Sequence, residues 1–495
     1  MLIGCSQNGN KNMSFNLDEE ALRQIVRGVI REMNGVAPKS CGCANKGAPA
    51  IISSSSSQGK GIFTDVASAV NAAYEGYRQL CKGGMEARKK IIDIVKAMTV
   101  VNAKEWGVFE YNETKIGKLD HKVGKLEIVK LVPGVEWIRP DAYSGDHGIM
   151  LEEYTPYGVI GAITPVTHSI PTIAGNIVNM VAAGNAIVFN PHPGGVKSAV
   201  KAVSAYNEEI EKQLGIKNLI CCIANPTLES FDAICKNDLV SIMCITGGPA
   251  VVNAAMKSGK KSICAGPGNP PVIVDDTVDV NKAAADIIAG GCFDNNLLCI
   301  GEKEIFVLES VADRFMRALD AQGAVKIGGS TLDKLTDAVF SKKDGHYALK
   351  RDLVGKDPYV LGEAAGISVS QNAPMLYADV DANHPFVIEE QMMPMIPVVV
   401  VKSFEEALAG AVRAEHGYKH SAIIHSMNVG RMTEMARALN TTLFVKNGPS
   451  TCGLGLGGEG YLSYSIATAT GEGISNPKTF TRRRRCVMVD NLNIF

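Results

Sequence analysis

The stretch between Glu153 and Lys197 contains no Asp, Glu, Lys or Arg, which limits what this part of the chain can form. It invites a membrane span, but Pro165, Gly175 and several Thr, Ser and Asn interrupt it. No unbroken apolar run approaches the ~20 residues that a span requires. We read YGVIGAIT as a buried strand, TIAGNIVNMVAA as a helix and NAIVF as the next strand. The stretch therefore predicts a βαβ unit of a parallel sheet.

The bulk composition is that of a soluble enzyme. A chain of 495 residues can bury a large core and is expected to divide into two or three domains. Its 50 basic and 51 acidic residues leave no net field that would favour nucleic acid or an anionic membrane as a partner. The 13 cysteines are odd in number and scattered, and Cys221 and Cys222 are adjacent. This indicates a reducing compartment and no disulfide framework.

Residues 1–35 predict an amphipathic helix, and residues 36–60 predict a flexible linker of small residues. The apolar stripe of the helix is Leu22, Ile25, Val26, Val29, Ile30 and Met33. Such a helix is marginally stable by itself, so we expect its stripe to bind a partner. The alternative is a helix packed on its own domain. Arg27 and Arg31 interrupt the apolar region, which argues against a signal peptide.

From about residue 61 the sequence predicts a helix-rich α/β fold with two sheets. One sheet holds the βαβ unit and LVSIMCIT, and the other holds PPVIVDD, EKEIFVLE and MIPVVVVK. Two α/β domains with a cleft between them are therefore expected. Ligands in such folds collect at the carboxyl ends of the strands.

Two glycine motifs lead to opposite interpretations. GLGLGGEG has the letters of a dinucleotide fingerprint, but a loop precedes it and strand-like residues follow it, so we reject it as a Rossmann site. In SIMCITGGPAVVNAAMKSGK a buried strand ends at Thr246, Gly247 and Gly248, and a helix begins near Pro249. The free backbone N–H groups of this second turn can hold a phosphate.

Three further features each allow a functional and a purely structural interpretation. Cys299 in FDNNLLCIGE is either a nucleophile or a small buried hydrophobe. His416 and His420 have the spacing of zinc ligands, but Gly417 interrupts any helix there and no third ligand is nearby, so we expect no metal. The run Arg482–Arg485 predicts a subunit contact or a solvated edge strand.

Ten motifs, taken in order, resemble those of the CoA-acylating aldehyde dehydrogenases of bacterial microcompartments, the propionaldehyde and acetaldehyde dehydrogenases of propanediol and ethanolamine utilisation. The motifs are TPVTHSIPT, AAGNAIVFNPHP, ITGGPAVV, AGPGNPPVIV, FDNNLLCIGEK, EEQMMPMIPVV, EHGYKHSAIIHS, FVKNGPS, GGEGYLSYSIATATGEG and TFTRRRRCV. The resemblance covers the chain from about residue 61 to the end. Residues 1–35 with their linker resemble the encapsulation peptide of that family.

The resemblance implies an aldehyde dehydrogenase-like α/β fold with two parallel-sheet domains, a cleft between them and a β oligomerisation arm at about 140–155. It divides the chain into a nicotinamide-cofactor-binding domain at 61–245, a catalytic domain at 246–430 and a return to the cofactor domain with an oligomerisation segment at 431–495. The implied protein is a homo-oligomer, a dimer or tetramer. It would work in the bacterial cytoplasm, inside a microcompartment whose shell proteins bind the terminal helix.

The implied reaction is oxidation of a short-chain aldehyde, propionaldehyde or acetaldehyde, with NAD. The Cys299 thiolate would add to the aldehyde, hydride would pass to NAD, and coenzyme A would take the acyl group from the resulting thioester. Hydrolytic relatives carry a water-activating glutamate in an ELGGK segment, and Cys264 stands at that position here. A thiol needs less help from a base than water does, so this change favours acyl-CoA as the product.

The resemblance also assigns site residues. Cys299 and His168 are the catalytic candidates. His168 replaces the usual asparagine of the family and could donate to an oxyanion or act as a base. The cofactor-binding candidates are Thr164, Pro165, Asn190, Pro191, His192, Thr246, Gly247, Gly248, Ala265 and Glu390. The alternatives are a hydrolytic aldehyde dehydrogenase giving free acid, a non-redox CoA acyltransferase, and a non-catalytic shell adaptor.

Overall fold

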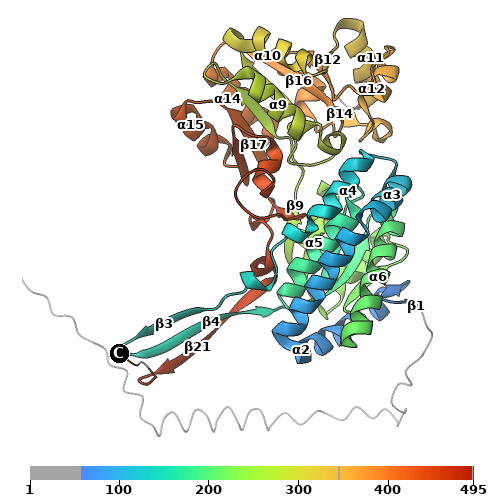
Figure 1. Cartoon of the computed structure of the whole chain (residues 1–495), viewed down its shortest axis with the longest axis vertical. Helices are drawn as coiled ribbons and strands as arrows, with labels where there is room; N and C mark the ends of the chain where they lie inside the picture. Colours follow the sequence, from blue (N-terminus) through green and yellow to red (C-terminus); the bar gives the residue numbers. More distant parts are fainter. Residues whose placement is uncertain (1–56, 344–345, 493, 495) are drawn as a thin grey trace, which may run out of the picture. The chain divides into compact units, whose positions relative to one another are not determined.

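The computed structural model describes residues 57–343, 346–492 and 494 (Figure 1). The predicted helix at 1–35 and most of the predicted linker at 36–60 lie outside these residues. The end of that linker is not a linker, because Ser57–Gly59 forms strand β1, which pairs antiparallel with β2 (Ile62–Phe63). The first sheet thus begins a few residues earlier than the sequence predicts, with one antiparallel strand at its edge.

The first sheet has the strand order β1-β2-β7-β6-β5-β8-β9. Its larger strands are β5 (Val159–Thr164), β6 (Ala186–Pro191), β7 (Ile220–Ile223), β8 (Val240–Thr246) and β9 (Lys261–Ala265). The βαβ unit predicted from the uncharged stretch is confirmed as β5, α5 (Ser169–Ala182) and β6. Every residue of α5 is buried, which explains why this stretch carries no charge.

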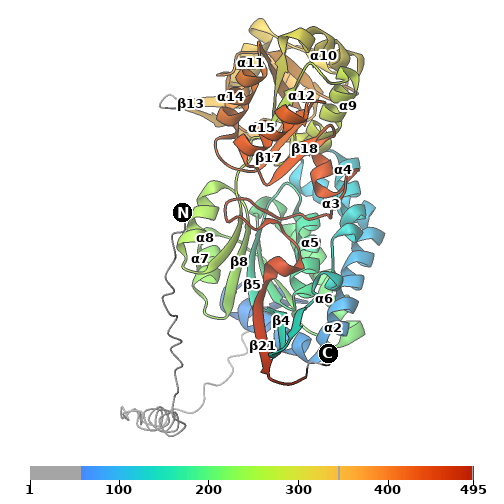
Figure 2. The same ribbon diagram turned by 90° about the vertical axis from the view of Figure 1, so that its left-hand side faces the viewer.

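Helices cover both faces of this sheet. Figure 2 shows α7 (Leu228–Lys236) and α8 (Pro249–Lys257) on one face, with α5 and α6 (Val196–Leu214) on the other. A long helix, α2 (Val66–Val101), packs against α5 and α6. This helix has a kink at Gly84, whose φ of 62° is not helical. Next along the chain come α3 (Ala103–Thr114) and α4 (Leu119–Glu127).

The second sheet is parallel throughout, in the order β12-β15-β16-β11-β10-β17-β18. Its strands are β10 (Pro271–Val274), β11 (Glu304–Leu308), β12 (Val325–Lys326), β15 (Leu376–Asp379), β16 (Met395–Val401), β17 (Ser421–His425) and β18 (Leu443–Lys446). Its helices are α9 (Val280–Gly291), α10 (Glu309–Ala321), α11 (Gly329–Val339), α12 (Pro358–Ala365), α13 (Pro385–Ile388), α14 (Phe404–Glu415) and α15 (Val429–Leu439). A hairpin, β13 (Phe340–Lys343) with β14 (His346–Leu349), follows α11.

The domain boundaries at 245/246 and 430/431 stay predictions, and the two sheets themselves end at later points in the chain. After β8 the chain returns through α8 and adds β9 to the first sheet, so the change of sheet falls between β9 and β10. In the same way α15 leads to β18, which extends the second sheet beyond β17. The physical reason is common to both, since a helix after a parallel strand brings the chain back beside the same sheet.

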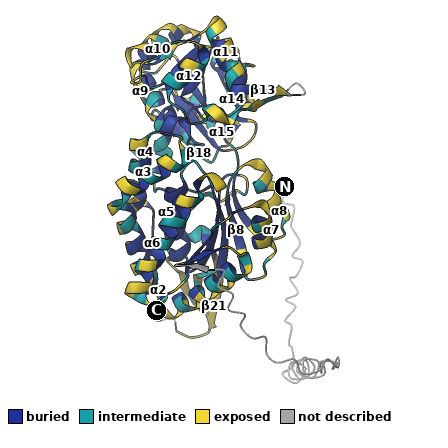
Figure 3. Cartoon of the chain, turned by 90° about the vertical axis from the view of Figure 1, so that its right-hand side faces the viewer, coloured by how far each residue is buried: buried dark blue, intermediate teal, exposed yellow. Residues whose placement is uncertain are grey.

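A third sheet forms an arm from β3 (Asp141–Gly145), β4 (Gly148–Pro156) and β21 (Thr481–Val489), visible in Figure 1. The strands predicted at about 140–155 are therefore present. The run Arg482–Arg485 lies on β21 and is exposed. Figure 3 shows that burial is concentrated on the two parallel sheets, whose buried residues form separate cores. Within the described ranges, no helix is both long and apolar enough to cross a membrane.

Candidate active site

All twelve residues proposed from the sequence line one cavity of about 670 Å³. They are Thr164, Pro165, His168, Asn190, Pro191, His192, Thr246, Gly247, Gly248, Ala265, Glu390 and Cys299. One wall consists of the carboxyl ends of β5, β6, β8 and β9. Because these strands are parallel, their ends meet at one edge of the sheet, beside the point where the strand order reverses.

The strand-end wall has free polar groups directed at a ligand. Thr164 Oγ1 and Thr246 Oγ1 are buried and have no hydrogen-bond partner within the described chain. A side chain built on Gly248 would meet nothing within 4 Å, so the backbone there is open to the cavity. Helix α8 begins at Pro249, and no described side chain caps it. Its first N–H groups therefore remain available to a phosphate, as a dinucleotide or coenzyme A requires.

The opposite wall carries Cys299 on a sharply turned segment. The short 3₁₀ turn η4 (Phe293–Asn296) contains three consecutive residues of positive φ, which are Asp294, Asn295 and Asn296 at 51°, 56° and 61°. Asn tolerates this conformation better than most residues. The Asn295 side-chain amide donates to the Gly355 carbonyl at 3.0 Å, and that of Asn296 donates to the Glu302 carbonyl at 2.9 Å. The two asparagines of the motif therefore shape the segment that presents the cysteine.

Cys299 is held as a thiol by its surroundings. It is partly buried and packs against the core of the first sheet. Burial raises its pKa to about 12, the negative charge of Glu390 adds to this rise, and Lys303 opposes it. Burial also raises the pKa of Glu390, with Lys303 and the Gly268 N–H opposing. A thiolate at Cys299 would therefore need the help of a base or of a bound ligand to form.

His168 lies at the N-cap of α5, where its carbonyl accepts from the Thr172 N–H at 3.1 Å. Its Nδ1 contacts Thr167 Oγ1 at 2.9 Å. Burial and the charges of Lys125 and Lys122 hold the pKa of His168 well below its ordinary value. The ring is therefore neutral at working pH, and positive neighbours make an imidazolium unfavourable.

Cys264 does not line the cavity, although the sequence suggests that it replaces a residue that does. Its side chain is fully buried in the core of the first sheet, and burial raises its pKa to about 11. Its N–H donates to Thr470 Oγ1 at 3.0 Å. The next residue, Ala265, is the one that reaches the cavity from β9.

The other sequence features have different surroundings. His416 Nε2 contacts the Ile388 carbonyl at 2.7 Å, and His420 Nδ1 contacts Ser421 Oγ at 2.8 Å. No group of three potential metal ligands occurs among the residues described. The glycine motif GLGLGGEG follows β18 and supplies Leu454 and Leu456 to the cavity, so its contribution is apolar.

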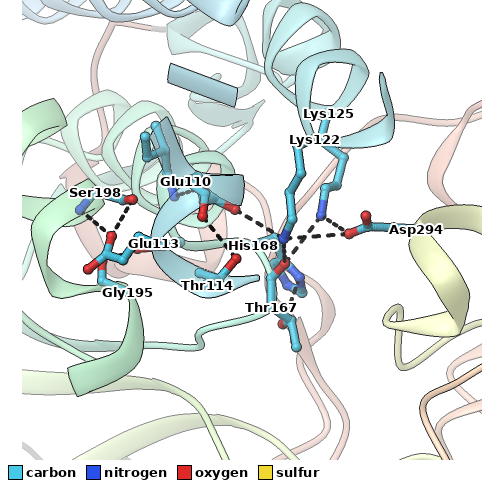
Figure 4. Close-up of polar contacts among 12 residues, drawn as sticks. Glu110, Glu113, Thr114, Lys122, Lys125, Thr167, His168, Gly195, Ser198 and Asp294 are labelled. Carbon is cyan, nitrogen blue, oxygen red and sulfur yellow. Dashed lines mark hydrogen bonds and ion pairs between the residues drawn. The ribbon is translucent and has the colours of Figure 1, made fainter. Parts of the chain in front are cut away.

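Sequence reasoning missed Lys125 and Arg351, which also line the cavity. Lys125 belongs to a buried group of charges with Glu110, Lys122 and Asp294, drawn in Figure 4. Lysines three residues apart on a helix are typical of a solvated face. Only Asp294, within the FDNNLLCIGE segment, carried a signal that could have drawn attention to it.

Comparisons with known proteins give a consistent set of relatives. The profile of the aldehyde dehydrogenase family matches residues 58–458. A Salmonella typhimurium propanal dehydrogenase (CoA-propanoylating) is 43% identical over 88% of this chain and 94% of that protein. Acetaldehyde dehydrogenase (acetylating) EutE of the same organism is 37% identical over 97% and 100%. A Rhodopseudomonas palustris propionaldehyde dehydrogenase, solved with bound CoA and an acylated cysteine, has a TM-score of 0.86 and 40% identity, covering 88% of this chain and 100% of that one.

Proposed function

The chain belongs to the aldehyde dehydrogenase family, and we propose that it converts a short-chain aldehyde such as propionaldehyde or acetaldehyde to acyl-CoA with NAD. The observation that supports this most strongly is the single cavity shared by Cys299 and the carboxyl ends of four parallel strands. The proposed nucleophile and the proposed phosphate-binding turn thus line the same cavity. The names of the CoA-acylating relatives give the same reaction class independently.

Cys299 carries the covalent chemistry in this proposal. Its thiolate Sγ adds to the aldehyde carbonyl, forming a C–S bond and an oxyanion. NAD, when bound, supplies the acceptor for the hydride that leaves this carbon, and a thioester on Cys299 remains. The thiol of coenzyme A then attacks the thioester carbonyl, its sulfur forming the new C–S bond of acyl-CoA as the bond to Cys299 breaks, and its proton passes to Cys299, which is released as a thiol. Sulfur suits both halves because a thioester keeps its carbonyl electrophilic.

The cavity residues divide the remaining tasks. His168 is neutral, and its Nδ1 contacts Thr167 Oγ1. This leaves Nε2 for an interaction with the substrate. Because nearby lysines disfavour an imidazolium, we assign Nε2–H as a donor to the oxyanion. Thr164, Thr246 and the turn at Gly247 would hold the phosphates and ribose of NAD or coenzyme A. Glu390 would face the nicotinamide ribose.

The test is the substitution Cys299→Ser, assayed as NADH absorbance and acyl-CoA formation with propionaldehyde and coenzyme A. We expect turnover to fall about a thousandfold or more while NAD binding stays unchanged. Cys452→Ser is the matched control, because Cys452 is also partly buried but does not line the cavity. Acyl-CoA formed without NADH would instead indicate an acyltransferase, and free acid as the main product would indicate a hydrolytic enzyme.

We further propose that residues 1–35 bind shell proteins of a bacterial microcompartment and hold the enzyme in its lumen, within the cytoplasm. The support is the apolar stripe in the sequence and the origin of a related propionaldehyde dehydrogenase in a fucose utilisation microcompartment. Deleting residues 1–35 should leave turnover in solution intact and release the enzyme from purified compartments. Loss of activity on deletion would show that the segment belongs to the enzyme's own fold.

We also propose that the arm of β3, β4 and β21 joins copies of the chain into a dimer or tetramer. Its strand β21 exposes Val487, Met488 and Val489 side by side with the arginine run. An exposed apolar edge of this kind is a natural pairing surface. Truncation after residue 480 should yield a smaller species in size-exclusion chromatography, and an unchanged elution volume would contradict the assignment.

A further inference from the structure

Four buried charged side chains connect the two walls of the cavity, and we call them the α4 network: Glu110, Lys122, Lys125 and Asp294. Each side chain is at most 3% exposed. Lys125 Nζ donates to Asp294 Oδ2 at 2.5 Å, and Lys122 Nζ lies 3.7 Å from the same oxygen. Asp294 belongs to the segment that presents Cys299, whereas both lysines belong to α4. Figure 4 shows Asp294 approaching the lysines from a different part of the fold.

The same lysines hold the loop that carries His168. The Thr167 carbonyl, one residue before His168, accepts from Lys122 Nζ at 2.5 Å and from Lys125 Nζ at 3.3 Å. Glu110 accepts from Lys122 Nζ at 3.3 Å, and its other oxygen accepts from the Ile170 N–H at 2.8 Å. One pair of ammonium groups is therefore shared between the His168 loop and the Cys299 segment.

Lys125 also contacts a third segment that lines the cavity. The Tyr464 hydroxyl donates to the Lys125 backbone carbonyl at 2.5 Å, and both residues line the cavity. Three segments that are distant in sequence thus meet at one residue of α4. A fixed meeting point of this kind sets the separation of the groups that each segment carries.

Asp294 is held by more than its charge. Its Oδ1 accepts from the Lys118 N–H at 2.8 Å, and its own N–H donates to His121 Nδ1 at 2.7 Å. A side chain added at Gly117 would lie 2.2 Å from Asp294 Oδ1, so this site fits the carboxylate closely. The positive φ of Asp294 is unfavourable for a residue other than glycine, and such a conformation persists where the surroundings over-determine it.

From these contacts we propose that the α4 network is a positioning device, with Lys125 and Asp294 fixing the Cys299 segment against the His168 loop for the hydride-transfer step. The proposal rests on the function assigned above. A buried ion pair is a weak source of stability, because desolvating the charges offsets their attraction. Such a pair does restrict the positions of the segments that carry it, because each buried charge is stable in one arrangement only. These residues touch the supports of the reacting groups and act through them.

The test compares steady-state kinetics of the full-length enzyme and three variants. Asp294→Asn keeps an acceptor for the Lys118 N–H but removes the charge that pairs with Lys125. We expect its kcat to fall about 100-fold, as for a small misplacement of reacting groups, with the KM for NAD within about twofold of wild type. Lys125→Gln should behave in the same way and serves if Asp294→Asn fails to fold. Lys125→Arg keeps the charge and should recover most of the loss.

Asp275→Asn is the matched control. Asp275 is fully buried and paired with Arg431 at 3.0 Å, but it lies away from the cavity. It should lower thermal stability and leave the kcat of the folded enzyme unchanged. Wild-type kcat in Asp294→Asn would overturn the proposal, and so would an equal loss in Asp275→Asn. If Cys299→Ser stayed active, the proposed function itself would fail, so the two failures are distinguishable.

Discussion

In the enzyme without a bound ligand, the thiol of Cys299 should react slowly with iodoacetamide at neutral pH. The rate of this alkylation should keep rising with pH beyond the range in which an ordinary thiol levels off. Burial and the Glu390 charge raise its pKa to about 12. At pH 8 the thiolate fraction would then be about 10⁻⁴, compared with about a quarter for an ordinary cysteine of pKa near 8.5. Alkylation should therefore accelerate about tenfold for each pH unit up to pH 10, without a plateau.

The assay is mass spectrometry of the Cys299 peptide after timed alkylation from pH 6 to pH 10. Exposed Cys81 in the same sample reports the behaviour of an accessible thiol. The variant Glu390→Gln removes a negative charge that disfavours the thiolate, so it should lower the pKa of Cys299 and speed its alkylation at every pH in this range. A plateau below pH 9, or slower alkylation in Glu390→Gln, would refute the electrostatic account of the site.

Three further predictions concern the packing around the site and are tested by thermal unfolding, with product analysis added for the third. Gly117→Ala should cost more than about 2 kcal/mol, because φ is 80° and the new carbon meets Asp294, whereas Gly215→Ala, with φ of 68° and open space, should cost about 1 kcal/mol. Asp294→Asn and Lys125→Met should each lower the free energy of unfolding by about 3 kcal/mol, because each leaves a buried charge unpaired. The double variant leaves one unpaired charge fewer, so its loss should be clearly less than the sum of the two. Additive losses would contradict the pairing. Cys264→Glu should strongly destabilise the first sheet, because it buries a carboxylate. In the fraction of enzyme that still folds, the share of free acid among the products should not rise.

The centre of the first sheet could be predicted from the residues alone, whereas Thr164 was assigned to the site through the family resemblance. An uncharged stretch with a helical interior predicts β5, α5 and β6, and parallel strands place Thr164 and Thr246 at the same edge. The opposite wall was predicted through the motif that contains Cys299. The motif identified Cys299 but did not explain its two asparagines. The structure shows that they lie in a turn of consecutive positive φ values.

The points where the chain leaves each sheet and the direction of the Cys264 side chain could not be predicted, for a related reason. A strand added after a helix, such as β9 or β18, is locally indistinguishable from the first strand of a new sheet. Matching Cys264 to a catalytic glutamate fixes its position along β9 but not the direction of its side chain. On a strand, one step along the chain changes the face, and Ala265 rather than Cys264 meets the cavity.

The α4 network shows what kind of information the sequence lacks. Lys125 and Asp294 are 169 residues apart, and neither has a local pattern that requires a partner. Lys122 and Lys125 have the spacing of a solvated helix face, yet both are buried, because α4 packs where the His168 loop and the Cys299 segment meet. Their burial is tolerable only because Glu110 and Asp294 arrive from two other elements and balance the two positive charges. In the proposal made above, the placement of Cys299 therefore depends on a charge balance that forms only when all three segments have folded together.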